Sequence, residues 1–211
     1  TSHAGHDFRD AMRAMNDLGY AVDPFVLDAK WFTPQSRPRL FVVCSLRDAE
    51  RAIDPGSLEP ARLRPRAVVD AVRSLRREIR WSIRDLAEPP SRAAKTLEDI
   101  IEDPGDADPA WWSEERVAYL LNQMFERHRA WVETRRHDAR VHYATAFRRV
   151  RRVEDGTKRS MAELRTDGLA GCLRTPKGGS ARQILMRTGR GRVHARLLSA
   201  TECASLMGAK G

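Results

Sequence analysis

The pattern of hydrophobic and polar residues predicts amphipathic helices in two N-terminal stretches. Over residues 7–18, apolar residues recur three or four positions apart, with Asp7 placed to cap the start and Gly19 to end the helix. A second helix is expected over residues 65–86, where an apolar inner side opposes a side rich in arginine.

The clearest helical pattern begins at Asp108–Pro109 or Ser113 and runs to about residue 136. Its acidic residues lie near the start and its basic residues near the end, which is the order that the helix dipole favours. His128 falls on the apolar face. We expect it to be a hydrogen-bonded core histidine, which is more common at such a position than a ligand.

Other segments predict strands. Residues 20–27 are interrupted by a proline and should lie near a sheet edge. Residues 40–44 form a continuous run of β-branched and aromatic residues, which predicts a buried strand. Residues 141–150 alternate, and residues 184–187 and 193–197 flank a turn as in a hairpin. A capping box at Ser-Ala-Thr-Glu, residues 199–202, predicts the start of a last helix.

The order of elements in residues 1–46 is helix, strand, short connection, strand. This order indicates one end of an α/β sheet from a larger domain, because two strands cannot bury both faces of a sheet by themselves. The chain also starts Thr-Ser-His, without Met and without an apolar signal region. We therefore expect a piece of something longer.

Polar residues precede the strand at 40–44 in an alternating pattern. Prolines favour an extended backbone here, so Gln35, Arg37 and Arg39 should project from one face. Two fork-shaped guanidiniums on one face suit a phosphate or a planar carbonyl edge in a nucleotide. The alternative is that both arginines are merely solvated, and the spacing alone leaves the two interpretations open.

Composition excludes several classes of protein. A hydrophobic fraction of 41% in 211 residues is sufficient for a core. No apolar run approaches the roughly 18 residues of a membrane span, so no membrane association is expected. Cys44, Cys172 and Cys203 are far apart, which predicts reduced thiols in a cytosolic protein and neither a disulfide framework nor a zinc site.

The charge is strongly basic and uneven. The formal net charge is +9, yet residues 1–50 carry six Lys/Arg against seven Asp/Glu, and residues 151–211 carry thirteen against five. A cationic C-terminal third favours a polyanion partner, above all nucleic acid. A generically arginine-rich composition is the alternative.

The sequence shows no complete active site. It contains no G-x-S-x-G, no G-x-G-x-x-G and no P-loop. His3 and His6 have no third ligand nearby in the sequence, so no metal site is expected. The loop at 177–180 could approach phosphates through backbone N–H groups, although Gly-rich turns are common.

Two motifs resemble those of the DNA cytosine-5 methyltransferases. Pro-Gln-Ser-Arg-Pro-Arg at 34–39, followed by an apolar strand, is similar to the family's Gln-x-Arg-x-Arg motif. The segment 196–208 is similar to its Arg-x-Leu-Thr-x-x-Glu-x-x-x-Leu-x-Gly segment, with Ser199 in place of Thr. The two occur in the family's order with a basic region between them, which makes coincidence improbable.

The resemblance implies a fold and a domain plan. Residues 1–46 would be the C-terminal end of a class I, S-adenosylmethionine-dependent methyltransferase sheet of the Rossmann-like α/β type. Residues 47–195 would be a target-recognition domain, mostly helical or mixed α+β. Residues 196–211 would start the return to the catalytic domain. The implied cofactor is S-adenosylmethionine, and the implied partner is double-stranded DNA with a flipped cytosine.

The resemblance also assigns roles to residues. Arg39 would hydrogen-bond O2 of the flipped cytosine, Arg37 would support the site or a phosphate, and Gln35 would orient the motif. Arg196, Ser199 and Glu202 would be structural. A further set would contact DNA, with arginines reading guanine in the major groove: Arg165, Arg174, Thr175, Lys177, Gly178, Gly179, Ser180, Arg182, Arg190 and Arg192.

Four family motifs are missing from the 211 residues: the Phe-x-Gly-x-Gly methyl-donor loop, the Pro-Cys nucleophile, Glu-Asn-Val and the family's final Asn-containing motif. We expect the chain to be inactive without a catalytic half supplied on the same or another chain. The implied setting is restriction-modification or phage defence in the bacterial cytoplasm, near the nucleoid. The alternative is a non-catalytic DNA-binding or assembly subunit derived from such an enzyme.

Overall fold

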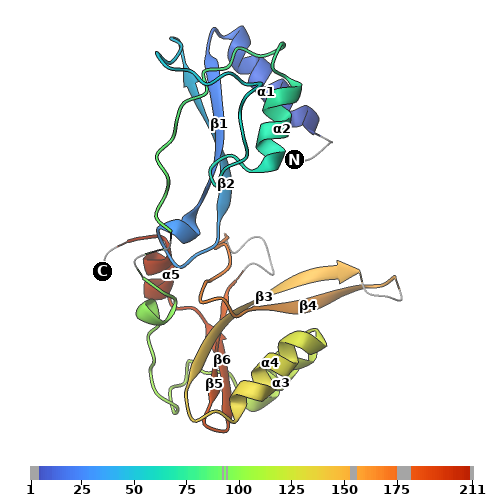
Figure 1. Cartoon of the computed structure of the whole chain (residues 1–211). Helices are drawn as coiled ribbons and strands as arrows, with labels where there is room; N and C mark the ends of the chain where they lie inside the picture. Colours follow the sequence, from blue (N-terminus) through green and yellow to red (C-terminus); the bar gives the residue numbers. More distant parts are fainter. Residues whose placement is uncertain (1–4, 92, 94, 153–155, 175–181, 210–211) are drawn as a thin grey trace. The chain divides into compact units, whose positions relative to one another are not determined.

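The computed structural model describes residues 5–91, 93, 95–152, 156–174 and 182–209. Contacts divide the chain into two compact units, each described by itself below (Figure 1). The first unit comprises Thr1–Asp28 and Pro38–Pro89, and the second comprises Ala29–Arg37 and Pro90–Gly211.

The first unit contains α1 (His6–Asp17), β1 (Ala21–Asp28), β2 (Pro38–Ser45) and α2 (Arg66–Ser74), and β1 and β2 pair antiparallel. The predicted first helix and its end are confirmed, since Gly19 follows α1 with a left-handed φ of 88°. The predicted cap is wrong: Gly5 occupies the N-cap position and no side chain caps the helix.

Both helices of the first unit contribute to its core. Phe8 and Met12 of α1 pack with Val22 of β1 and with residues that follow α2, and Val69 and Val72 of α2 form a second apolar cluster. A buried ion pair lies at β1, where Arg64 donates to Asp23 at 2.7 Å and both side chains are less than a tenth exposed. Sequence reasoning did not predict this pair.

The predicted helix over 65–86 is wrong beyond residue 74. After Ser74 the chain turns, and residues 80–82 run beside β1, with Val22 N donating to Arg80 O and Ser82 N donating to Val22 O. These backbone bonds replace the helical ones. Ile79 and Ile83 are nevertheless buried, so the apolar pattern identified core residues but not their secondary structure.

The strand predicted over 40–44 is confirmed as part of β2, but its predicted burial is not. Leu40 and Phe41 are 44% and 45% exposed, and Cys44 is also exposed. Phe41 stacks on Phe25 of β1, with ring centroids 5.9 Å apart. Leu40 and Phe41 are consecutive and so point to opposite faces of the strand, which means that both faces are exposed at this end of β2.

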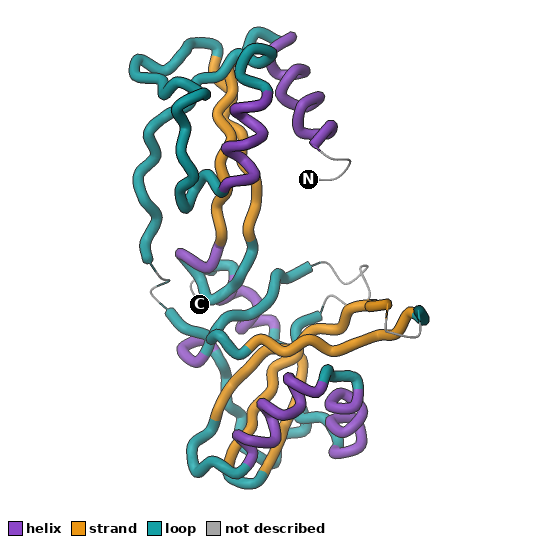
Figure 2. The backbone as a smooth tube through the Cα atoms, turned by 45° about the vertical axis from the view of Figure 1, so that its right-hand side comes forward, coloured by secondary structure: helices purple, strands orange, loops and turns teal. Residues whose placement is uncertain are grey.

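The second unit is built on a four-stranded antiparallel sheet in the order β4-β3-β5-β6, with α3 and α4 on one face (Figure 2). Its elements are η2 (Ala29–Trp31), η3 (Glu98–Ile100), α3 (Glu114–Asn122), α4 (Glu126–Arg136), β3 (His142–Arg152), β4 (Lys158–Arg165), β5 (Ile184–Gly189), β6 (Arg192–Leu197) and α5 (Ala200–Leu206).

The predicted helix from Ser113 to about residue 136 is two helices. Ser113 caps α3 as the pattern predicts, by accepting from Arg116 N. The helix then breaks at Gln123, whose carbonyl accepts from Ala162 N of β4. Main-chain pairing with the sheet therefore interrupts a pattern that is helical throughout. His128 accepts from Leu164 N at 3.3 Å, so its predicted hydrogen bonding is confirmed, but the side chain is half-buried at the margin of the core.

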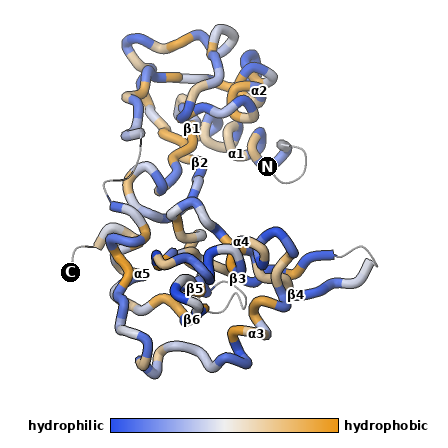
Figure 3. The backbone as a smooth tube through the Cα atoms, turned by 60° about the horizontal axis from the view of Figure 1, so that its bottom comes forward, coloured by the Kyte–Doolittle hydropathy of each residue, from blue (hydrophilic) through white to orange (hydrophobic). Residues whose placement is uncertain are grey.

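The C-terminal predictions are also confirmed. The hairpin is β5–β6, and the capping box of α5 forms between Ser199 and Glu202. The three cysteines are not disulfide-bonded. Hydrophilic residues, blue in Figure 3, predominate where β3 and β4 extend beyond the rest of the sheet.

The fold is thus mixed α/β with two small antiparallel sheets. The predicted boundaries after residues 46 and 195 do not coincide with the two compact units, because residues up to Pro89 pack with the first helix and strand. A Rossmann-like sheet and the assignment of catalytic and recognition domains stay predictions.

Candidate nucleic-acid interface

Gln35 holds two distant segments of the second unit together. Its side chain is 3% exposed, its Nε2 donates to Leu206 O at 3.0 Å, and its Oε1 accepts from Leu173 N at 3.1 Å. Both ends of the amide are therefore satisfied, as a buried amide requires. The backbone of Ser36 also pairs with Ala170, so the segment after η2 runs beside residues 170–173.

Arg37 reaches the same residue as Gln35. Its guanidinium donates to Leu173 O at 3.2 Å, and the side chain is exposed. Gln35 and Arg37 thus contact the same residue, although Gln35 is buried and Arg37 is exposed; the common face predicted for Gln35, Arg37 and Arg39 stays a prediction. Arg39 belongs to the first unit, where it is exposed on β2 and donates to Pro38 O at 2.8 Å.

A pocket of about 250 Å³ lies in the second unit beside this segment. We call it the arginine pocket, and its lining residues come from five parts of the chain: Ser36, Phe147, Arg148, Arg149, Arg165, Gly171, Cys172, Arg174 and Gln183. Four of the nine are arginines and none is acidic, so the charge of the lining suits an anion.

Two residues that line the pocket, Gly171 and Gln183, are packed against each other, and we call them the floor of the pocket. Gln183 is 5% exposed, and its Oε1 accepts from Gly171 N at 3.0 Å. A Cβ on residue 171 would lie 2.7 Å from that same oxygen. Glycine therefore allows the 170–173 segment to approach Gln183 closely.

The arginines of the pocket are oriented by their neighbours. Arg148 donates to the Gln123 amide oxygen at 2.8 Å, and Arg165 grips Asp167 with two nitrogens, at 3.2 and 2.6 Å. Burial alone would raise the pKa of Asp167, but the hydrogen bonds and charge of Arg165 lower it below its ordinary value. Arg149 is less constrained, since the nearest carboxylate in an ion pair with it is 4.0 Å away.

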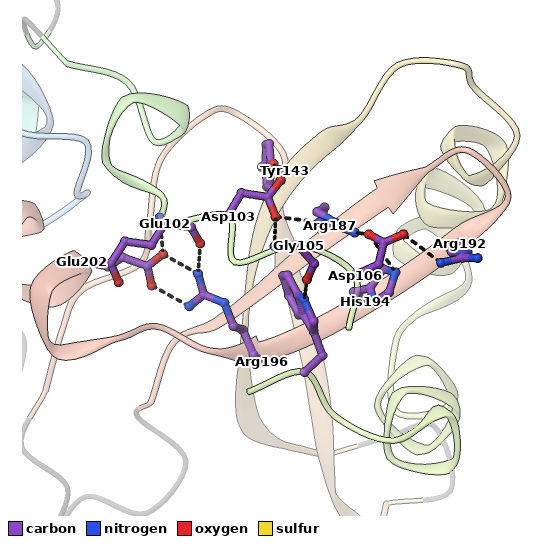
Figure 4. A network of polar contacts seen from close by, with 11 residues as sticks. Glu102, Asp103, Gly105, Asp106, Tyr143, Arg187, Arg192, His194, Arg196 and Glu202 are labelled. Atoms are coloured by element: carbon purple, nitrogen blue, oxygen red, sulfur yellow. Dashed lines mark hydrogen bonds and ion pairs between the residues drawn. The ribbon is translucent and has the colours of Figure 1, made fainter. Parts of the chain in front are cut away.

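A second arginine cluster of the same unit, which we call the acidic clamp, is balanced by carboxylates. Arg187, Arg192 and Arg196 of the β5–β6 hairpin pair with the carboxylates of Asp103, Asp106 and Glu202, and Arg196 also donates to the backbone oxygen of Glu102 (Figure 4). The guanidiniums of Arg187 and Arg196 also lie 5.0 and 5.3 Å from the Trp111 ring centre, at cation–π distance.

The ion pair of Arg196 and Glu202 is the most buried contact of the acidic clamp. Two guanidinium nitrogens donate to the two carboxylate oxygens at 2.7 and 2.6 Å, and Glu202 is completely buried. Burial acts to raise the pKa of Glu202, but hydrogen bonds from Arg196 and from the backbone of Ser199 and Glu102 hold it below its usual value. The Glu202 hydrogen bonds raise the pKa of Arg196.

Asp103 extends the clamp to the sheet. It accepts from Tyr143 Oη at 2.8 Å and from Arg187 at 2.6 Å. Burial and this carboxylate raise the pKa of Tyr143 to about 12. The arrangement keeps the tyrosine protonated and serves to fasten the acidic loop to β3 and β5.

The predicted DNA-contacting residues do not gather at one place. Arg165 and Arg174 line the arginine pocket, and Arg182 is exposed. Arg192 pairs with Asp106 at 2.7 Å, and Arg190 donates to Ala139 O at 3.2 Å. Neither residue of the hairpin lines the pocket. The remaining predicted contacts lie outside the described residues: Thr175, Lys177, Gly178, Gly179 and Ser180.

Sequence reasoning missed several residues of the pocket, namely Phe147, Arg148, Arg149 and Gln183. The available signal was the run of arginines in the strand predicted over 141–150, which alternation alone assigned to a sheet. Gln183 had no signal, because its role depends on contact with Gly171.

The described part of the chain holds no group of three or more His, Cys, Asp or Glu side chains that could bind a metal ion. Its helices also include none that is both long and apolar enough to cross a membrane.

Comparison with known proteins gives one match. A family model described as C-5 cytosine-specific DNA methylase matches residues 1–210. Searches of curated proteins and of solved structures found no match.

Proposed function

Because this chain belongs to the C-5 cytosine-specific DNA methylase family, we propose that it contributes the DNA-recognition part of a DNA cytosine-5 methyltransferase. The observation that carries the proposal is the arginine pocket. Four guanidiniums line it with no carboxylate in the lining, and Gln35 of the Gln-x-Arg-x-Arg motif fixes the segment that forms its edge.

The chemistry of the substrate explains the need for such a surface. Carbon 5 of cytosine cannot be reached inside the stacked duplex, so the base must be flipped out while the remaining duplex is held. Phosphate contacts supply most of the holding energy and fix the orientation of the protein. In the proposal, Arg148, Arg149, Arg165 and Arg174 make these contacts.

The motif residues have separate roles in the proposal. Gln35 is a positioning residue, because both ends of its amide are used within the protein. Arg37 follows Ser36, which lines the pocket, and its guanidinium is anchored to Leu173 O, from where it supports the bound DNA backbone. Arg39 contacts the flipped cytosine, where a guanidinium can donate to O2 and stabilise the charge that develops there.

S-adenosylmethionine, the methyl donor of this family, does not fit the residues described. The named strands all pair antiparallel, so they form no carboxyl edge of a parallel sheet, where such cofactors bind. The 211 residues also contain no Phe-x-Gly-x-Gly motif and no Pro-Cys pair. We therefore propose that S-adenosylmethionine binds to a segment that carries these motifs and not to the residues described.

Methyl transfer tests the proposal. The chain is mixed with a polypeptide that carries the missing family motifs, and incorporation of labelled methyl groups into C5 of cytosine is measured on a G·C-rich duplex. Transfer that depends on both components is expected. The Arg39→Ala variant should lose turnover far more than duplex affinity, since its contact acts on the reacting base. Equal losses in both would contradict the role of Arg39.

The absence of the nucleophile motif from the sequence favours a second candidate function, that of a non-catalytic DNA-binding or assembly subunit. Duplex binding without transfer under every combination of components would support this alternative. A chain that binds no duplex would contradict both functions.

A further inference from the structure

The β3–β4 hairpin projects from its sheet. β3 pairs with β5 only over His142–Ala146, whereas it pairs with β4 as far as Arg152. Residues 147–152 and 158–163 therefore form a two-stranded ribbon, which Figures 1 and 2 show extending past the other strands. The described apolar core includes no residue of 147–152.

The ribbon is strongly basic, and its strand register places like charges opposite each other. Residues 147–163 carry six Lys or Arg and three Asp or Glu. Arg151 lies directly opposite Arg159, and Arg152 lies directly opposite Lys158. Like charges placed opposite each other destabilise a strand pair. Such pairs at the end of a projecting hairpin are the pattern expected where a polyanion supplies the compensating charge.

The arginine pocket reaches the base of the ribbon, where Phe147, Arg148 and Arg149 line it. Alternation along β3 places Arg149 and Arg151 on the same face as Phe147, and Arg148 on the opposite face. Glu163, 17% exposed, accepts from Arg151 and orients that guanidinium on the Phe147 face, while Arg149 lies 4.0 Å from the same carboxylate. The cross-strand register adds Arg159 to the same face.

The dimensions of the ribbon select one groove of DNA. Paired strands lie about 4.8 Å apart, and six residues extend about 20 Å. The major groove is about 12 Å wide and about 8.5 Å deep and admits a two-stranded ribbon, whereas the minor groove is only about 6 Å wide.

We propose that the β3–β4 ribbon enters the major groove of duplex DNA, with Arg149, Arg151 and Arg159 facing the backbone and the guanine edges. This inference rests on the proposed function, and assigns groove insertion to an element that the sequence motifs do not mark. The Gln35-anchored segment and the arginine pocket then hold the adjoining phosphates.

The test uses the full chain and a short G·C-containing duplex. The variant Arg151→Gln/Arg159→Gln is compared with Arg129→Gln/Arg140→Gln, which removes two exposed cations from α4 and from the other end of β3. The ribbon variant should bind at least about tenfold more weakly, and its salt dependence should fall by about 1.8 in slope, while the control stays close to wild type.

Two further measurements separate groove insertion from general charge attraction. Dimethyl sulfate modifies guanine N7 in the major groove and adenine N3 in the minor groove. Bound wild type should protect guanine N7, and the ribbon variant should lose that protection. The Arg159→Glu variant places opposite charges across the strands, so it should keep or raise the melting temperature while binding DNA more weakly.

The outcomes are distinguishable. If wild type binds duplex but the ribbon variant matches the control, or if only adenine N3 is protected, the ribbon proposal is overturned and the proposed function stands. If wild type binds no duplex, both are overturned.

Discussion

The second unit uses arginine in two contrasting ways. In the acidic clamp, Arg187, Arg192 and Arg196 pair with the carboxylates of Asp103, Asp106 and Glu202, and the side chains of Arg187 and Arg196 are less than a tenth exposed. In the arginine pocket, the four arginines share their lining with no acidic residue. Their carboxylate partners lie outside the lining: Arg165 pairs with Asp167, and Arg149 lies 4.0 Å from Glu163.

This difference indicates which arginines should contribute to folding stability and which should contribute to DNA affinity. A buried guanidinium that is removed leaves its carboxylate uncompensated, which affects stability. An exposed guanidinium contributes little to stability, because solvent screens it, but it can displace counterions from a nucleic acid.

The largest effect is expected from Arg196→Met. The substitution leaves Glu202 buried without its guanidinium and should lower the free energy of unfolding by about 3–5 kcal/mol. Urea denaturation followed by tryptophan fluorescence measures it. Arg192→Met is the matched control: this side chain is 65% exposed, so its pair with Asp106 should contribute at most about 1 kcal/mol. If both variants lost a similarly small free energy of unfolding, the buried pair would not stabilise the fold more than the exposed pair does.

A smaller effect is expected from pH. Because hydrogen bonds hold the pKa of Glu202 below its ordinary value of 4.5, its stabilising contribution is present above about pH 4.5 and is lost as the pH falls through the lowered pKa. Glu202→Gln should therefore be less stable than wild type at neutral pH and should lose less stability on acidification. Parallel curves of unfolding free energy against pH would show that Glu202 does not contribute in this way.

The pocket itself is tested by Arg165→Gln/Arg174→Gln. Duplex affinity should fall roughly tenfold, about 1.4 kcal/mol, and the salt slope by about 1.8. Stability should change by less than about 1 kcal/mol, because the Arg165–Asp167 pair is partly solvated. Fluorescence anisotropy across a salt series measures both quantities, with Arg129→Gln/Arg140→Gln as the control. A loss of stability with unchanged duplex binding would show that Arg165 and Arg174 have a structural role, like the arginines of the acidic clamp.

The smallest effect is expected from Gly171→Ala. The new Cβ would displace the Gln183 amide from the floor of the pocket and should weaken duplex binding by a few-fold. No charge is removed, so the slope of affinity against salt should remain that of wild type. A reduced slope would show that the substitution disturbs the arginines and not only the floor.

The sequence predicted the elements whose signals are local. The hairpin at β5–β6, the cap of Ser113 and the capping box of Ser199 depend on residues a few positions apart, and all three are confirmed. The two motifs that resemble the family are also local, and the family is shown.

What the sequence could not predict depends on contacts between distant residues. The helix break at Gln123 requires β4, and the end of α2 requires residues 80–82 to pair with β1. The arginine pocket needs segments from Ser36 to Gln183, so no single motif reveals it. At the helix break and after α2, backbone groups that could have continued a helix instead form hydrogen bonds with distant strands. Helix propensity along the sequence cannot predict these long-range bonds.

The interleaving of the two units has a consequence for exchanging one unit between related proteins. Residues Ala29–Arg37 belong to the second unit although Thr1–Asp28 and Pro38–Pro89 belong to the first, so the units are joined by three covalent links. A chimaera that transplants only Pro90–Gly211 would separate Leu173 and Leu206 from the Gln35 with which they pair. A graft that keeps these contacts must therefore include Ala29–Arg37 together with Pro90–Gly211.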